Sequence, residues 1–154
     1  MAFVLGLNHK IYVQTTGPRA AWPGTGAAPA LEEITLAMDV TFTGDAATAD
    51  ASTRGGGSFR QSVATLKDAE VEFEAVFDTA DTAVIALKDA WLANTVIGIA
   101  ILNGESATAA VEGIWMDAMV TGMEWNQELE EVGKIQFTLK NALSNVALEW
   151  ITVG

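Results

Sequence analysis

Strict alternation of apolar and polar residues constrains this chain more than any other feature. In residues 70–77 (EVEFEAVF), apolar side chains stand at 71, 73, 75 and 77, with glutamates at 70, 72 and 74. A period of two places each set on one face of a β-strand. Residues 34–42 repeat the pattern, and further strands are expected at 11–13, 95–102, 110–125, 134–141 and 145–152. We therefore predict an all-β sandwich or barrel.

One flanking helix is expected, over residues 79–93. Apolar side chains recur there at helical spacing. Asp78 suits the N-cap and Asp81 the first turn, because carboxylates are favourable at the positive end of a helix. Asn94 can adopt the left-handed conformation that ends a helix.

Two segments lack any periodicity. Residues 1–30 combine a short N-terminal strand with an arm or loop that holds all three prolines. Residues 44–58 (GDAATADASTRGGGS) contain no bulky apolar side chain and read as a long loop between strands. Loops of this length inside a compact domain are usually functional or disordered. The length of the whole chain, residues 1–154, fits a single domain.

Composition excludes several kinds of chemistry. Twenty acidic residues against eight basic ones give a net charge of −12, which argues against binding driven by attraction to phosphates. The absence of cysteine and the single histidine exclude thiolate and multi-histidine sites within one chain. The triple glycine at 55–57 lacks the lysine of a nucleotide-binding loop. We expect no catalytic residues, no metal, no cofactor and no enzyme activity. The longest apolar run after the first residues, 96–102, is far shorter than a membrane-spanning helix, so we also expect no membrane partner.

Residues 110–125 carry apolar side chains on both faces of one long strand. We assign Trp115, Met119, Met123 and Trp125 to one of these faces, as part of the core or of a subunit interface. A platform that binds sugars or another ligand is the alternative. Two arginines, Arg54 and Arg60, flank the triple glycine, and arginine is the favoured cation at interfaces. These features favour self-assembly by pairing of strand edges.

A series of segments, in this order, resembles the tail tube (major tail) proteins of long flexible-tailed phages and of gene-transfer particles. They are residues 53–60 (TRGGGSFR), 66–74 (LKDAEVEFE), 77–81 (FDTAD), 129–131 (LEE) and 135–140 (IQFTLK). The resemblance extends over residues 34–140. It implies a β-sandwich subunit that forms hexameric rings, which stack into a hollow tube with a continuous inner β-barrel. It also implies a place in the virion tail, after assembly in the host cytoplasm.

The resemblance further implies roles for particular residues. The ring-stacking candidates are Arg54, Gly55, Gly56, Gly57, Phe59 and Arg60. The lumen-facing candidates are Asp39 and Thr41, or Glu70, Glu72 and Glu74. The implied partners are further copies of the chain, the tape-measure protein and genomic DNA in the lumen, and the tail terminator and distal tail proteins. An acidic wall would repel DNA and let it slide.

Two other functions remain open at this point. One is a monomeric β-sandwich module that binds a carbohydrate or another ligand. The other is the tube protein of a contractile tail or a secretion apparatus.

Overall fold

The computed structural model describes residues 9–14, 31–142 and 148–153, and it confirms a mainly β fold with one helix. Most of the predicted N-terminal arm, residues 15–30, lies outside the described residues. The elements are β1 (Lys10–Gln14), β2 (Glu32–Glu33), β3 (Ala37–Asp50), a 3₁₀ helix η2 (Arg54–Gly56), β4 (Ser62–Val76), α1 (Thr82–Ala93), β5 (Val96–Leu102), β6 (Glu112–Asn126), β7 (Lys134–Asn141) and β8 (Glu149–Thr152).

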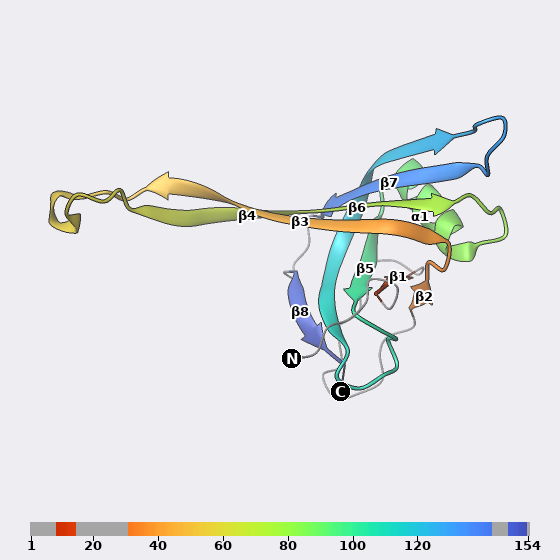
Figure 1. Cartoon of the computed structure of the whole chain (residues 1–154), viewed down its shortest axis with the longest axis horizontal. Coiled ribbons are helices and arrows are strands. Elements are labelled where there is room, and N and C mark those ends of the chain that lie inside the picture. Colours follow the sequence, from red (N-terminus) through yellow and green to blue (C-terminus); the bar gives the residue numbers. More distant parts are fainter. Residues whose placement is uncertain (1–8, 15–30, 143–147, 154) are drawn as a thin grey trace.

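All eight strands belong to one antiparallel sheet. Its order is β2-β1-β5-β6-β7-β4-β3, and β8 pairs with the first residues of β6. Figure 1 shows β3, β4 and β7 running across the molecule, whereas β5 and β8 run down it. A single strongly curved sheet therefore takes the place of two separate layers.

Strand β6 makes the turn between the two parts of the sheet. Its residues 113–119 pair with β5, and its residues 118–126 pair with β7. A register shift between Val120 and Gly122 interrupts the ladder, and such bulges bend a strand. Because of this bend, one 15-residue strand contributes to two differently directed parts of the sheet. The bend also separates one part of the sheet from β5, β1, β2 and β8. We call this part the four-strand layer; it consists of β3, β4, β7 and residues 118–126 of β6.

The main core lies on one face of the four-strand layer. Val71 and Phe73 of β4 and Phe137 and Leu139 of β7 are buried there, together with Leu87 of α1. The rings of Phe73 and Phe137, which are paired across the strands, lie 5.6 Å apart. The helix and the core thus cover this face, and the alternating glutamates of β4 are left on the other face.

Helix α1 begins later than predicted. Its N-cap is Asp81, whose side chain accepts a hydrogen bond from the Ala83 N–H at 3.0 Å. Asp78, the predicted cap, instead accepts from the Ala80 N–H in the preceding turn. The predicted end is confirmed, because Asn94 adopts the left-handed conformation with φ 55°.

The prediction of a loop over residues 44–58 is wrong for its first half. Strand β3 continues to Asp50 and pairs with β4, so that residues 44–50 belong to a long hairpin. Backbone hydrogen bonds to a paired strand hold these small residues in a strand without any apolar face. Residues 46–67, which we call the arm, project from the rest of the molecule, the body (Figure 1).

Candidate self-assembly surfaces

The face of the four-strand layer that lies opposite the core carries a row of carboxylates, the carboxylate face. Glu70, Glu72 and Glu74 stand on it at every second position of β4. Each faces a polar partner on β7: Lys140 lies 3.8 Å from Glu70, Lys134 lies 3.7 Å from Glu74, and Gln136 donates a hydrogen bond to Glu72. The face is therefore a partly neutralised acidic surface.

The two sets of lumen-facing candidates share one face of the sheet at Thr41. Thr41 of β3 lies directly opposite Glu72, so it belongs to the carboxylate face. Asp39 is exposed within the irregular start of β3, where the register shifts between Ala37 and Val40. Sequence reasoning could not combine the two sets, because strand alternation does not reveal which strands are neighbours.

Further charges on the carboxylate face were missed at the sequence level. Asp68 continues the row on β4, Asp45 lies opposite it on β3, and Glu124 of β6 lies opposite Gln136. With Glu70, Glu72, Glu74, Lys134 and Lys140, the face bears six carboxylates and two lysines, a net charge of −4.

Both edges of the four-strand layer are open. Among the described residues, β3 pairs only with β4, and residues 120–126 of β6 pair only with β7. Open edges present unpaired N–H and C=O groups and are templates for pairing with another chain.

The arm carries the predicted ring-stacking residues at its end, far from the body. Arg54, Gly55 and Gly56 form η2, and Gly57 has a positive φ of 79°, which glycine adopts without strain. Phe59 is 84% exposed, and Arg60 is exposed beside it. No described part of the chain covers this aromatic ring.

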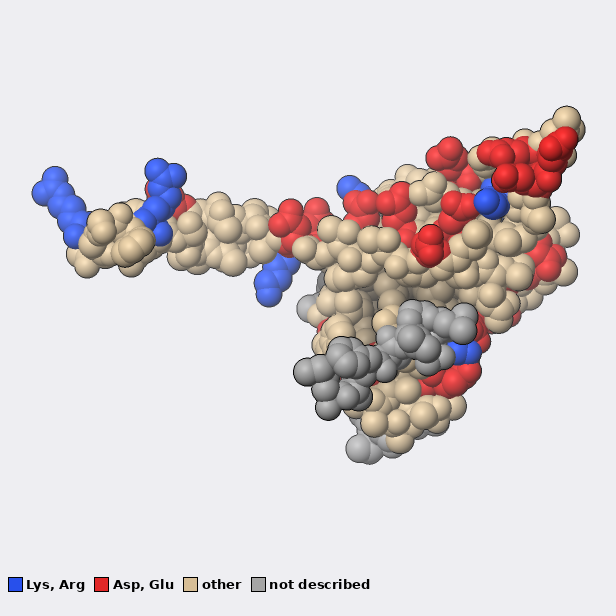
Figure 2. Space-filling view, in the orientation of Figure 1, with Lys and Arg blue, Asp and Glu red and all other residues tan. Residues whose placement is uncertain are grey.

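Charge is divided unevenly between arm and body. The arm holds three cations (Arg54, Arg60 and Lys67) and one carboxylate (Asp50), a net charge of +2, whereas the rest of the chain has a net charge of −14. Figure 2 shows the basic side chains along the arm and the acidic ones gathered on the body. The two parts are therefore electrostatically complementary.

The bulge in β6 divides the four predicted interface residues. Trp115 is fully buried in its own chain, in a second cluster with Tyr12, Leu102 and Ile151, so its assignment to an interface is wrong. Met119 is half-buried. Met123 and Trp125 lie opposite Phe137 and Ile135 and so face the main core, not the side of Trp115. Trp125 is 55% exposed and packs on Phe77, with ring centroids 5.0 Å apart. The alternative, an exposed ligand-binding platform built from these side chains, is contradicted by the burial of Trp115 and by the core-facing side of Met123 and Trp125.

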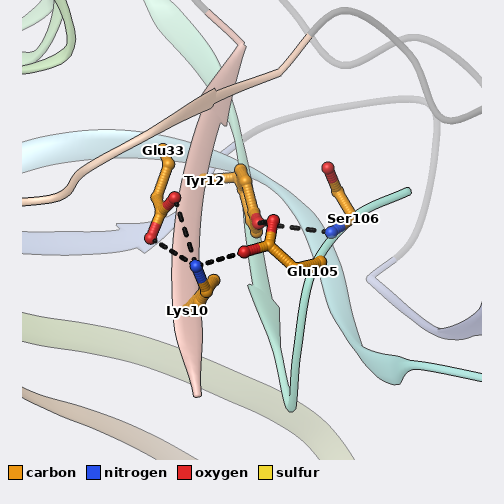
Figure 3. Close-up of polar contacts among 5 residues, drawn as sticks. All are labelled: Lys10, Tyr12, Glu33, Glu105 and Ser106. Carbon is orange, nitrogen blue, oxygen red and sulfur yellow. Dashed lines mark hydrogen bonds and ion pairs between the residues drawn. The ribbon is translucent and has the colours of Figure 1, made fainter. Parts of the chain in front are cut away.

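A polar cluster ties β1 to its neighbours (Figure 3). Lys10 donates hydrogen bonds to Glu105, which follows β5, and to Glu33 of β2. The hydrogen bonds that Lys10 donates to the carboxylates of Glu105 and Glu33 raise the pKa of Lys10 well above its usual range. The hydrogen bond from Lys10 lowers the pKa of Glu105, and burial raises the pKa of Tyr12. The cluster is an ion-paired brace between strands.

Neither a metal-binding cluster nor a membrane-spanning helix occurs in the part of the chain that the structure describes. No group of three or more His, Asp or Glu side chains is placed there to hold a metal ion. No helix in that part is long and apolar enough to cross a membrane.

An antiparallel sheet that curves around one helix, with a protruding hairpin, is the fold of tail tube subunits, and this chain has that fold. The tail of an empty gene transfer agent particle, refined with C6 symmetry, matches it with a TM-score of 0.68 at 16% identity, over 95% of this chain and 97% of that one. The SPP1 tail tube matches with a TM-score of 0.67 at 14% identity, over 98% of this chain and 79% of that one. A chain of the anti-feeding prophage baseplate matches with a TM-score of 0.63 at 8% identity, over 99% of this chain and 98% of that one. No protein-family model and no curated protein matches the sequence.

Proposed function

We propose that this chain is the non-enzymatic structural subunit of a tail tube. Copies form hexameric rings, and the rings stack into the hollow tube of a virion tail. One observation carries the proposal: among the described residues, the four-strand layer is open at both edges and its carboxylate face is uncovered. The fold, which is shared with the gene transfer agent tail and the SPP1 tail tube, supports it.

Strand direction supports closure of the ring. Each strand of the four-strand layer is antiparallel to the next, so β3 and residues 120–126 of β6 run in opposite directions. Rotation about a ring axis therefore brings β3 of one copy beside β6 of the next in antiparallel orientation. The ladder then continues around the ring, and a closed barrel leaves no edge unpaired.

The carboxylate face lines the bore in this arrangement, because α1 and the main core occupy the other side of the layer. Thr41, Glu70, Glu72 and Glu74 then face the lumen, whereas Asp39 lines a pocket with Lys10 and Ile11 of β1 and Ile101 of β5. The net charge of −4 on this face of each copy repels nucleic acid, so DNA passes without adhering. The tape-measure protein occupies the same lumen before DNA does.

The arm makes the contact between rings, through Arg54, Phe59 and Arg60 and the three glycines between them. Its net positive charge suits the acidic body of a neighbouring copy. The terminator and distal tail proteins cap the two ends of the tube, and assembly takes place in the host cytoplasm.

Electron microscopy and cysteine protection test the proposal together. The purified chain at high concentration should form rings or tubes. Because the chain has no cysteine, Glu72→Cys and Asp89→Cys each introduce a unique thiol. A maleimide polymer too large for the bore should label both monomers, but in tubes it should label only Asp89→Cys, on the exposed side of α1. Monomers at every concentration, or labelling of Glu72→Cys in tubes, would refute the proposal.

A tube within a contractile particle is a second candidate, because the anti-feeding prophage baseplate has the same fold. The two candidates differ in the outer surface of the tube. Binding of a sheath protein to assembled tubes would favour the contractile type.

A further inference from the structure

A groove of about 670 Å³ lies where the arm leaves the body. Its apolar lining includes Phe42, Ala46 and Ala69 from the hairpin and Leu148 from the segment before β8. Ala69 is buried, and Phe42 and Leu148 pack against the main core. The groove is therefore continuous with the main core, and no other described residue covers its apolar lining.

The register of the hairpin determines which charge faces the groove. Ala46 lies opposite Lys67, and Gly44 lies opposite Ala69, so Lys67 points to the same side as the buried Ala69. Asp45 and Asp68 alternate with these residues and point to the carboxylate face. Lys67 forms no ion pair with any residue that the structure describes. The groove thus combines an apolar lining with one cation that has no ion-pair partner among the described residues, while Asp45 and Asp68 border the groove and direct their side chains to the other face of the hairpin.

The turn between β6 and β7 has the complementary character. Leu129 is fully exposed, with a relative accessibility of 102%, and Val132 is 64% exposed. Glu128, Glu130 and Glu131 surround Leu129 in the sequence, and the Glu130 side chain forms no hydrogen bond or ion pair with a described residue. Phe59 at the end of the arm is the competing occupant, but Arg60 beside it would repel Lys67.

We infer that the β6–β7 turn of one copy docks in the groove of a second copy, with Leu129 in the apolar lining and Glu130 beside Lys67. The contact cannot form within one chain, because the turn precedes Lys134 at one end of β7 and the groove includes Asn141 at the other end. The eight residues between them span about 27 Å at ~3.4 Å per residue.

A contact between opposite ends of the same strand is heterologous and joins copies head to tail. Copies so joined repeat along the strand direction, and the arm of each copy then lies over the body of the next. This inference rests on the proposed tube function, for which it names the axial contact between rings.

Leu129→Asp tests the inference, with Leu92→Asp on α1 as the control, since Leu92 is also 64% exposed and lies away from the groove. We expect Leu129→Asp to form rings but to shorten tubes about tenfold or more, because a charge replaces the docked side chain. Lys67→Glu should also shorten tubes, and Glu130→Lys combined with it should restore them. If wild type forms neither rings nor tubes, the proposed function fails; if Leu129→Asp tubes are as long as Leu92→Asp tubes, only this inference fails.

Cross-linking gives an independent readout. The double variant Ala46→Cys/Leu129→Cys, oxidised after assembly, should give a ladder of covalent multimers, because each copy joins one neighbour through its turn and another through its groove. Ala46→Cys/Leu92→Cys should give no ladder. Equal ladders from the two variants, or none from the first in preparations that contain tubes, would overturn the docking.

Discussion

At the scale of single residues, Gly113 occupies the closest approach between β5 and β6. A Cβ atom added at Gly113 would lie 1.9 Å from the carbonyl oxygen of Ile101, so the backbone of β5 would have to move. We predict that Gly113→Ala lowers the free energy of unfolding by about 3 kcal/mol. Gly55→Ala is the control, because its nearest neighbour is the Thr53 hydroxyl at 4.0 Å. Urea denaturation of both variants measures the difference, and equal midpoints would contradict the prediction.

The brace around Lys10 predicts a dependence of stability on pH. The hydrogen bond from Lys10 lowers the pKa of Glu105 in the folded chain below the ordinary 4.5. The stabilisation that the ion pair of Lys10 and Glu105 contributes is therefore fully present above pH 4.5. It is lost as the pH falls through the lower pKa that Glu105 has in the folded chain. Glu105→Gln should destabilise the chain at pH 7 and should differ less from wild type in strong acid.

Denaturation of Glu105→Gln and wild type across this pH range provides the measurement. Glu130→Gln is the matched control, because the Glu130 side chain forms no hydrogen bond or ion pair with a described residue. A constant difference between Glu105→Gln and wild type at every pH would show that the carboxylate's charge does not contribute.

At the scale of elements, the ends of α1 provide a direct comparison between sequence pattern and structure. Asp78 and Asp81 both precede the helix, but only Asp81 accepts a hydrogen bond from the first turn. We predict that Asp81→Ala lowers the free energy of unfolding by about 1 kcal/mol and that Asp78→Ala lowers it by less than half as much. Thermal unfolding followed by circular dichroism measures both, and the reverse order would assign the cap to Asp78.

Strand positions could be predicted from alternation, but the faces of strands could not be followed past a bulge. The shift between Val120 and Gly122 moves Met123 and Trp125 to the core side, and the shift between Ala37 and Val40 leaves Met38 49% exposed. A bulge inserts one residue into one strand only, so it can be recognised only when the strand's pairing with its partner is known. The assignment of Trp115 to an interface failed for a related reason, since its cover comes from β1 and β8, distant in sequence.

At the scale of the whole molecule, the division of charge was only partly visible in the sequence. The arginines beside the triple glycine indicated a contact region, but the length of the arm depends on pairing between residues 44–50 and 62–69. These residues are mostly small, so no apolar period marks them as strands. Their backbone pairing becomes evident only once β3 and β4 are known to be neighbours. The same pairing places Lys67 in the groove and directs the acidic residues to the other face.

Removal of the arm separates folding from stacking. Ala46 and Lys67 are directly opposite each other, so replacing residues 47–66 by Asn-Gly should close a two-residue hairpin at the base of the arm. The shortened chain keeps the main core and the groove, and we expect its thermal midpoint to stay within a few degrees of wild type. Its rings should form, because the four-strand layer keeps both edges, but the tubes should be shorter by an order of magnitude. Negative-stain microscopy with calorimetry tests this expectation. Full-length tubes from the shortened chain would mean that the docked β6–β7 turn alone holds the rings together.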